Sequence, residues 1–365
     1  MQRRTTLTGA AVVLAVTALV ATGCAAAPDD TGAPADTIDF LPCAASDLTG
    51  FDDGDFNELS YNGVKQASEE LGSALKTAES AAEDQYTSNI ASLVDQECDF
   101  IVTVGFALAN ATRDSARENP EVKYALIDST VTDDDFQTIQ LDNVKPVLFD
   151  TAQAAVLAGY LAAGASQTGK VGTFGGMPFP SVTIFMDGFA DGVAHYNKVH
   201  GTSVQLFGWD KAAQNGTFLG SFDDQLGAKT ITAGLIDQGA DIIMPVAGNL
   251  YMSSVEALKE AGGAGAIIGV NSDVYDRDTT SGPYLLTSVM KNLTLATYEV
   301  TTAAAKGDFD NTPYVGTLAN GGVDIAPTHD WEAKLPASLL EEVAQLKADI
   351  ISGAFVVDSP SSPRI

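Results

Sequence analysis

The sequence has few of the residues that enzymes and metal centres use most. It contains three histidines and three cysteines in 365 residues. The histidines, His195, His200 and His329, do not stand at the spacings of a metal site. A Gly-x-Ser-x-Gly nucleophile motif and a Gly-x-x-x-x-Gly-Lys-Ser/Thr phosphate loop are both missing. We therefore expect a protein that is not an enzyme and that uses no cofactor and no metal ion.

Basic residues are also scarce. Lysine and arginine number 19 against 48 aspartates and glutamates, which gives a formal net charge of −29. Such an acidic surface repels the phosphates of nucleic acids and of anionic lipids. The composition therefore argues against a nucleic-acid partner, and a soluble, monomeric protein outside the cytoplasm is expected.

The N-terminus lacks an apolar run long enough to span a bilayer comfortably. Arg3 and Arg4 precede an uncharged stretch from residue 7 to 21, a pattern typical of an export signal over 1–23. Cys24 follows a small residue, as in a lipoprotein cleavage box, and is expected to carry the lipid anchor (palmitate) at the extracytoplasmic face of the cell membrane. Residues 24–36 read as a flexible tether. The alternative is an ordinary signal peptide with a chance cysteine.

The other two cysteines are candidates for one disulfide, because exported proteins keep such bonds. Cys43 lies in the first predicted strand and Cys98 opens another. If these strands are neighbours, a Cys43–Cys98 bridge is feasible. Two buried thiols are the alternative.

Short apolar runs alternate with helical patterns along the rest of the chain. This alternation predicts an α/β fold with two doubly wound, Rossmann-like lobes. We place lobe I at 37–143 plus about 280–315, and lobe II at 144–279 plus about 316–357. The Ser- and Pro-rich residues 358–365 are expected to be disordered.

Residues 47–57 form an acidic and aromatic loop between a predicted strand and a predicted helix, where α/β proteins bind ligands. A calcium loop starting at Asp53 fails, because Glu58 replaces the required glycine and Val64 the final glutamate. Asp47 is a candidate ligand contact. Asp52, Asp53 and Asp55 are expected to shape the turn and cap the helix.

Phe56 in this loop and Phe222 in a comparable loop of the second lobe could hold one flat ring between them, although single phenylalanines are more often core residues. Asp128 and Asp273 end strands and can accept hydrogen bonds there. Lys291 could pair with Asp273, and such a pair could equally be structural. Gly248 would let a ligand approach backbone N–H groups.

The order of these motifs resembles the basic membrane lipoprotein family, the purine-nucleoside-type substrate-binding lipoproteins of ABC transporters. The resemblance runs through nearly the whole chain after the signal. The segments that carry it are 47–57, 104–106, 126–128, 158–163, 175–178, 220–222, 247–248, 268–273 and 286–291.

The resemblance implies a fold like the type I periplasmic binding proteins, with two lobes joined by a three-segment hinge, and an ABC permease as partner. It implies that Phe56 and Phe222 sandwich a purine base and that Asn57 and Asp128 read its polar edge. Asp47, Gly248, Asp273 and Lys291 would hold the ribose and neighbouring groups.

The sequence departs from the family pattern near this site. Asp55 replaces a serine, Asn271 stands where an aspartate is frequent, and residues 249–252 (Asn-Leu-Tyr-Met) replace a Gly-rich turn. Two other functions therefore remain open: binding of another flat heterocycle such as riboflavin, and a surface enzyme that processes nucleosides.

Overall fold

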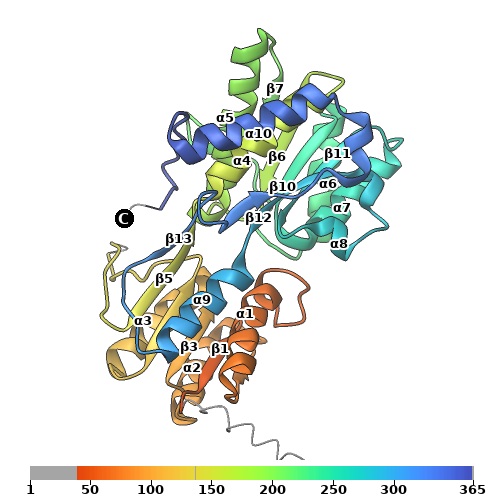
Figure 1. Cartoon of the computed structure of the whole chain (residues 1–365). Coiled ribbons are helices and arrows are strands. Elements are labelled where there is room, and N and C mark those ends of the chain that lie inside the picture. The colour runs from red at the N-terminus through yellow and green to blue at the C-terminus, as the bar shows by residue number, and fades with distance from the viewer. Residues whose placement is uncertain (1–38, 136, 364–365) are drawn as a thin grey trace, which may run out of the picture. The chain divides into compact units, whose positions relative to one another are not determined.

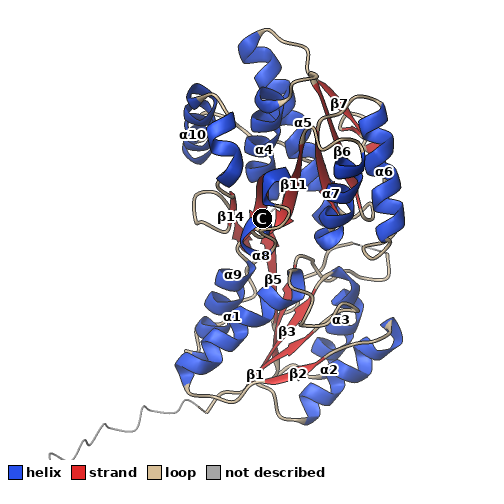
Figure 2. Cartoon of the chain, turned by 90° about the vertical axis from the view of Figure 1, so that its right-hand side faces the viewer, coloured by secondary structure: helices blue, strands red, loops and turns tan. Residues whose placement is uncertain are grey.

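The computed structural model describes residues 39–135 and 137–363, which carry two six-stranded sheets with helices on both faces (Figures 1 and 2). The predictions for the signal at 1–23, the lipidated Cys24 and the tether at 24–36 lie outside the described residues. Within the described ranges, no helix is both long enough and apolar enough to cross a membrane.

The first sheet has the strand order β13-β5-β4-β3-β1-β2, and all its neighbouring strands are parallel. Its strands are β1 (Pro42–Ala45), β2 (Lys76–Ala78), β3 (Phe100–Val104), β4 (Lys123–Ile127), β5 (Val144–Phe149) and β13 (Tyr314–Gly316). Its helices are α1 (Phe56–Leu71), α2 (Tyr86–Asp95), α3 (Ala109–Glu118) and α9 (Leu293–Ala305), with the short η1 (Glu83–Gln85) and η2 (Phe106–Leu108). Helices α1 and α9 lie on one face, and α2 and α3 on the other (Figure 2). We call this unit lobe I.

The second sheet has the order β14-β12-β11-β10-β6-β7, and only the edge strand β14 is antiparallel to its neighbour. Its strands are β6 (Lys170–Gly175), β7 (Gln205–Phe207), β10 (Ile242–Val246), β11 (Ala266–Asn271), β12 (Leu285–Lys291) and β14 (Val323–Ile325), beside the small ribbon of β8 (Trp209–Asp210) and β9 (Asn215–Gly216). Its helices are α4 (Thr151–Ala165), α5 (Pro180–His200), α6 (Gln225–Asp237), α7 (Tyr251–Glu260), α8 (Val274–Arg277) and α10 (Ala337–Ser352), with η3 (Gly248–Leu250), η4 (Gly282–Tyr284) and η5 (His329–Lys334). We call this unit lobe II.

The predicted α/β fold with two doubly wound lobes is therefore confirmed. Its strands are the short apolar runs of the sequence: every residue of β3 and of β10 is buried. Strands covered by helices on both faces need apolar side chains on both sides, which is why these runs do not alternate with polar residues.

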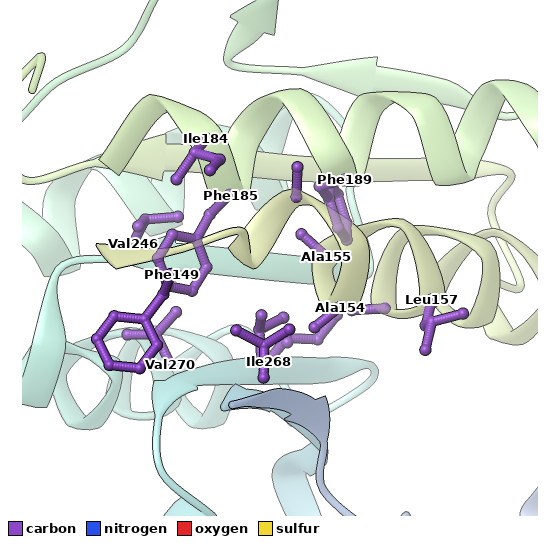
Figure 3. Close-up of a cluster of buried hydrophobic side chains, with 14 of the residues drawn as sticks. Phe149, Ala154, Ala155, Leu157, Ile184, Phe185, Phe189, Val246, Ile268 and Val270 are labelled. Carbon is purple, nitrogen blue, oxygen red and sulfur yellow. The ribbon is translucent and has the colours of Figure 1, made fainter. Parts of the chain in front are cut away.

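Helix α4 is buried against α5 in the core of lobe II, where Phe185 and Phe189 also lie, and Phe149 at the end of β5 in lobe I joins the same cluster (Figure 3). Two glycines allow the helices to approach closely. A Cβ atom on Gly159 would overlap the carbonyl of Phe189, and one on Gly192 would overlap the carbonyl of Val156. Larger residues at these positions would push the helices apart.

The lobe boundaries expected from the sequence are wrong at two places. The first was placed before residue 144, but β5 pairs with β4 in lobe I, so the chain crosses only at Asp150. Asn143, just before β5, donates hydrogen bonds of 2.9–3.1 Å to three carbonyls of lobe I. The second was placed near 280, but β12 pairs with β11 in lobe II.

The second crossing follows Lys291, because the next helix belongs to lobe I. Thr297 in α9 donates a hydrogen bond of 2.9 Å to the carbonyl of Ser60 in α1. The chain crosses a third time between β13 in lobe I and β14 in lobe II. Three segments therefore connect the lobes, near residues 150, 292 and 317–322.

The C-terminal residues that the structure describes differ from the predicted disordered tail. Ser359 is buried, and its hydroxyl donates to Asp187 at 2.6 Å. Ser362 donates to Asp150 at 2.8 Å, beside the first crossing. Serine and proline suggested solvent exposure, but carboxylates supply partners for these hydroxyls: Asp187, which is fully buried, and Asp150, which is partly buried.

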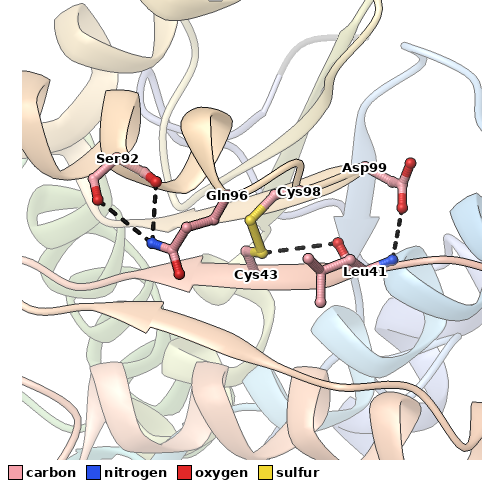
Figure 4. The surroundings of a disulfide bond; sticks show 6 residues. All are labelled: Leu41, Cys43, Ser92, Gln96, Cys98 and Asp99. Atoms are coloured by element: carbon pink, nitrogen blue, oxygen red, sulfur yellow. Dashed lines mark hydrogen bonds between the residues drawn. A yellow bond between two sulfur atoms is a disulfide. The ribbon is translucent and has the colours of Figure 1, made fainter.

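Cys43 and Cys98 form the predicted disulfide, with their Cα atoms 6.1 Å apart (Figure 4). The fold brings them together because β1 pairs with β3, and Cys98 lies just before β3. Leu41 and Asp99 add a backbone-to-carboxylate hydrogen bond of 2.7 Å between the same two segments. The bridge thus fixes the start of lobe I.

Candidate functional site

The loop between β1 and α1 is organised around Asp53. One carboxylate oxygen of Asp53 accepts hydrogen bonds from the backbone N–H groups of Asp55 (2.8 Å) and Glu58 (3.0 Å), and the other accepts from Asn57 N–H (3.0 Å). These are N–H groups at the start of α1 that have no partner within the helix. Asp53 therefore caps α1, as expected, and Asp52 is exposed.

Asn57 is buried, and its amide braces this loop. The side-chain nitrogen donates to Asp47 (2.9 Å), Thr49 (2.7 Å) and Asp53 (3.1 Å), and the side-chain oxygen accepts from Asp47 N–H (3.2 Å). Asp47 is thereby held next to Gly105, where a Cβ atom would lie 3.5 Å from its carboxylate. The family resemblance implied that Asn57 contacts the ligand. Here the nitrogen and the oxygen of its side-chain amide both form hydrogen bonds within the loop.

Asp55 was expected to cap α1, but it turns towards lobe II instead. Asp55 is only 3% exposed, and the side-chain amide of Asn271, at the end of β11, donates a hydrogen bond of 2.8 Å to its carboxylate. Arg277 of α8 lies 3.4 Å from its other oxygen. Burial raises the pKa of Asp55 from 3.8 to about 6, against the opposing effects of Arg277 and of the Asn271 hydrogen bond. Capping is left to Asp53 alone.

Gly248 and Asn249 of lobe II meet the same loop. Gly248 has a φ of +56°, and a Cβ atom there would lie 3.3 Å from the Asp55 carboxylate. Asn249 donates to the carbonyl of Asp53 at 2.6 Å. The three departures from the family pattern, Asp55, Asn249 and Asn271, are therefore all contacts between the two lobes.

Lys291 pairs with Asp128, not with Asp273. Lys291 ends β12 in lobe II and Asp128 directly follows β4 in lobe I, so the ion pair joins the lobes beside the second crossing. Their side chains are 3% and 11% exposed. The Lys291 ammonium also lies 5.0 Å from the ring centre of Phe185 and 5.9 Å from that of Phe56. Aromatic faces stabilise a cation placed at such distances.

Asp273 lies away from Lys291 and binds His329, whose Nε2 is 2.6 Å from its carboxylate. Its other oxygen accepts from Tyr275 N–H and caps α8. Tyr275 stacks on His329 with ring centres 4.0 Å apart. Ligand atoms of Asp273, Asp276 and His329 lie within 4.8 Å of one another, which the spacing of histidines along the chain did not indicate. Asp276 is exposed. Asp273 already forms hydrogen bonds with His329 and Tyr275, so we assign this cluster of three residues a structural role.

The aromatic residues of the site include two that the sequence prediction missed. Phe106 follows β3 in lobe I, and Phe179 precedes α5 in lobe II; their ring centres are 3.9 Å apart. Phe222 lies 6.5 Å from Phe106, and Phe56 borders the adjacent Gly105, where a Cβ atom would lie 3.5 Å from its ring. The two predicted clamp residues thus approach the same segment, Gly105–Phe106, from different lobes.

A usable signal for Phe106 was present in the sequence. It comes directly after the glycine that follows an apolar strand, at the carboxyl edge of a parallel sheet. Phe179 precedes Pro180, the first residue of α5, and proline is favoured at that position. The site therefore combines phenylalanines from both lobes with carboxylates of lobe I and the Lys291 ammonium of lobe II, which suits binding of a flat polar molecule between them.

Comparison with known proteins gives consistent matches over most of the chain. The family described as "ABC transporter substrate-binding protein PnrA-like" matches residues 44–351. Basic membrane protein A of Borreliella burgdorferi is 31% identical over 251 residues, which cover 65% of this chain and 69% of that protein. The ABC transporter nucleoside-binding protein BmpA of Lactococcus lactis is 26% identical over 338 residues, covering 88% and 90%.

Among solved structures, an ABC transporter solute-binding protein from Aeropyrum pernix K1 superposes with a TM-score of 0.74. It is 26% identical, and the match covers 87% of this chain and 94% of that one. The predicted fold of the type I periplasmic-binding-protein kind is thereby confirmed.

Proposed function

This chain belongs to the PnrA-like family of ABC transporter substrate-binding proteins, as the resemblance predicted, and we propose that it binds a purine nucleoside between its two lobes for import. The descriptions of the family and of the Lactococcus lactis relative name substrate-binding proteins, not enzymes. Binding without catalysis also agrees with a site made of phenylalanines, carboxylates and amides.

The match to a nucleoside-binding relative along 88% of the chain is the observation that carries this proposal. In the proposed complex Phe56 and Phe222 contact the two faces of the base, with Phe106 and Phe179 beside them. Asp47, Asp128 and Lys291 supply polar groups around it. Each aromatic contact would contribute on the order of 1 kcal/mol.

The proposal extends to the setting of the protein. A lipid on Cys24 would anchor the chain at the extracytoplasmic face of the cell membrane, where a monomer delivers its ligand to an ABC permease. Metabolic labelling with palmitate tests this, because a Cys24→Ala variant should lose the label and appear in the soluble fraction.

Mass spectrometry of small molecules released from the purified protein tests the ligand class. A purine nucleoside is expected. A flavin, which would also colour the protein yellow, would replace the proposal with the riboflavin alternative. Release of free base from added nucleoside would point instead to the enzyme alternative. Phe56→Ala and Phe222→Ala should each weaken nucleoside binding at least several-fold, and Phe40→Ala, which changes a ring packed on Phe100, should not.

A further inference from the structure

Asp55 has an environment that the architecture of its own loop does not explain. Asp53 already caps α1, and Asn57 braces the turn. Asp55 nevertheless carries a buried carboxylate, 3% exposed, between the two lobes. Burying a carboxylate costs free energy unless each oxygen finds a partner.

The two carboxylate oxygens of Asp55 are in different situations. Oδ2 accepts the 2.8 Å hydrogen bond from Asn271 and faces Gly248. Oδ1 is buried and has no hydrogen-bond partner within residues 39–135 and 137–363. Arg277 is its nearest cation, at 3.4 Å, a distance that gives electrostatic attraction without a hydrogen bond of ordinary geometry. An acceptor left open in this way is suited to a donor from a bound molecule.

The surroundings of Oδ1 limit the chemistry of that donor. Arg277 already supplies a positive charge, so a second cation would be repelled, while a phosphate or carboxylate would be repelled by Asp55 itself. A neutral hydroxyl can donate to the carboxylate without either penalty. Asp55 directly precedes Phe56, and the Lys291 ammonium, 5.9 Å from the centre of the Phe56 ring, also interacts electrostatically with the Asp55 carboxylate. The carboxylate and the ring therefore belong to the same part of the site.

We propose that Oδ1 of Asp55 accepts a hydrogen bond from a sugar hydroxyl of the bound ligand, with Asn271 and Arg277 positioning the carboxylate from the opposite lobe. Asp55 is then a specificity-determining residue, and its carboxylate is held in position only when Asn271 and Arg277 of the other lobe contact it. This inference rests on the proposed function, because it assumes that the ligand carries a sugar.

Isothermal titration with inosine and its 2′-, 3′- and 5′-deoxy analogues tests the inference. The analogue that lacks the hydroxyl bound by Asp55 should bind the unchanged protein roughly tenfold more weakly than inosine, because Oδ1 is then left without a donor. In Asp55→Ala this ratio should fall towards one. Asp52→Ala, a change to an exposed acid of the same loop, should keep the ratio of the unchanged protein.

The outcomes separate the two ideas. Equal ratios in the unchanged protein and in Asp55→Ala would overturn the role of Asp55 and leave nucleoside binding intact. No binding of any nucleoside by the unchanged protein would overturn both. If Asp55→Ala does not fold, Asp55→Asn supplies the ratio, because it keeps the side-chain shape but removes the charge that strengthens the hydroxyl bond.

Discussion

Asn271, at the end of β11 in lobe II, donates a hydrogen bond of 2.8 Å to Asp55, which immediately precedes α1 in lobe I. This hydrogen bond, the Lys291–Asp128 pair and the contact between Phe106 and Phe179 join the two lobes, each of which is built on its own sheet. Polar and aromatic contacts of this kind can be made and broken as lobes move.

The raised pKa of Asp55 predicts a pH dependence of stability. Its pKa is about 6 in the folded protein and near 3.8 when the chain is unfolded, so the folded state holds the extra proton between these values. Stability from this group is therefore greatest at low pH and is lost as the pH rises from about 4 to 6. Thermal melts of the unchanged protein and of Asp55→Asn should diverge across that window, with the variant gaining relative stability as the pH rises. Parallel curves would contradict the burial of Asp55.

Removing the cap of α1 should destabilise lobe I. Asp53→Ala leaves the N–H groups of Asn57 and Glu58 without their acceptor, at a cost of about 1–2 kcal/mol. Urea unfolding monitored by circular dichroism measures the loss. Asp52→Ala is the matched control, since Asp52 is exposed; equal effects of both substitutions would refute the assignment of the cap.

Breaking the ion pair between the lobes should cost more. Lys291→Met leaves the Asp128 carboxylate without its cation in a nearly buried position, which costs about 3 kcal/mol. Asp128→Asn added to Lys291→Met should recover part of this loss, because it removes the unpaired charge, and asparagine tolerates the φ of +60° at this position. The same unfolding experiment compares Lys291→Met, Asp128→Asn and the double variant. Additive losses in the double variant would show that the two side chains do not interact.

Loss of the disulfide should destabilise the start of lobe I. The bridge closes a loop between residues 55 positions apart, and such a constraint contributes about 2–4 kcal/mol through the unfolded chain. A Cys43→Ala, Cys98→Ala double variant should lose this amount and become insensitive to dithiothreitol, which should destabilise the unchanged protein. A melting temperature that reductant leaves unchanged would argue against the bridge.

The sequence predicted the elements of the fold better than the lobe to which each belongs. Buried strands such as β5 and β12 are recognisable as short apolar runs, yet nothing in either run tells which sheet it joins. Membership depends on the neighbouring strand, β4 for β5 and β11 for β12. The helix after β12, α9, packs on α1 of lobe I. The local sequence pattern of α9 does not indicate which lobe it joins.

The site was predicted in part, for a related reason. Lys291 and Asp128 were named, but their pairing depends on how two strand ends from different lobes meet. Asp53 and Asp55 are two residues apart, and both suit a helix cap. Which of them turns to the other lobe is decided by Asn271 and Arg277, more than 200 residues further along the chain.

The central claim is that the protein binds a purine nucleoside, and isothermal titration of the purified chain with inosine, guanosine and adenosine tests it most directly. We expect saturable binding of at least one of them at one molecule per chain. Absence of heat with all three, from protein shown to be folded and free of co-purified ligand, would contradict it.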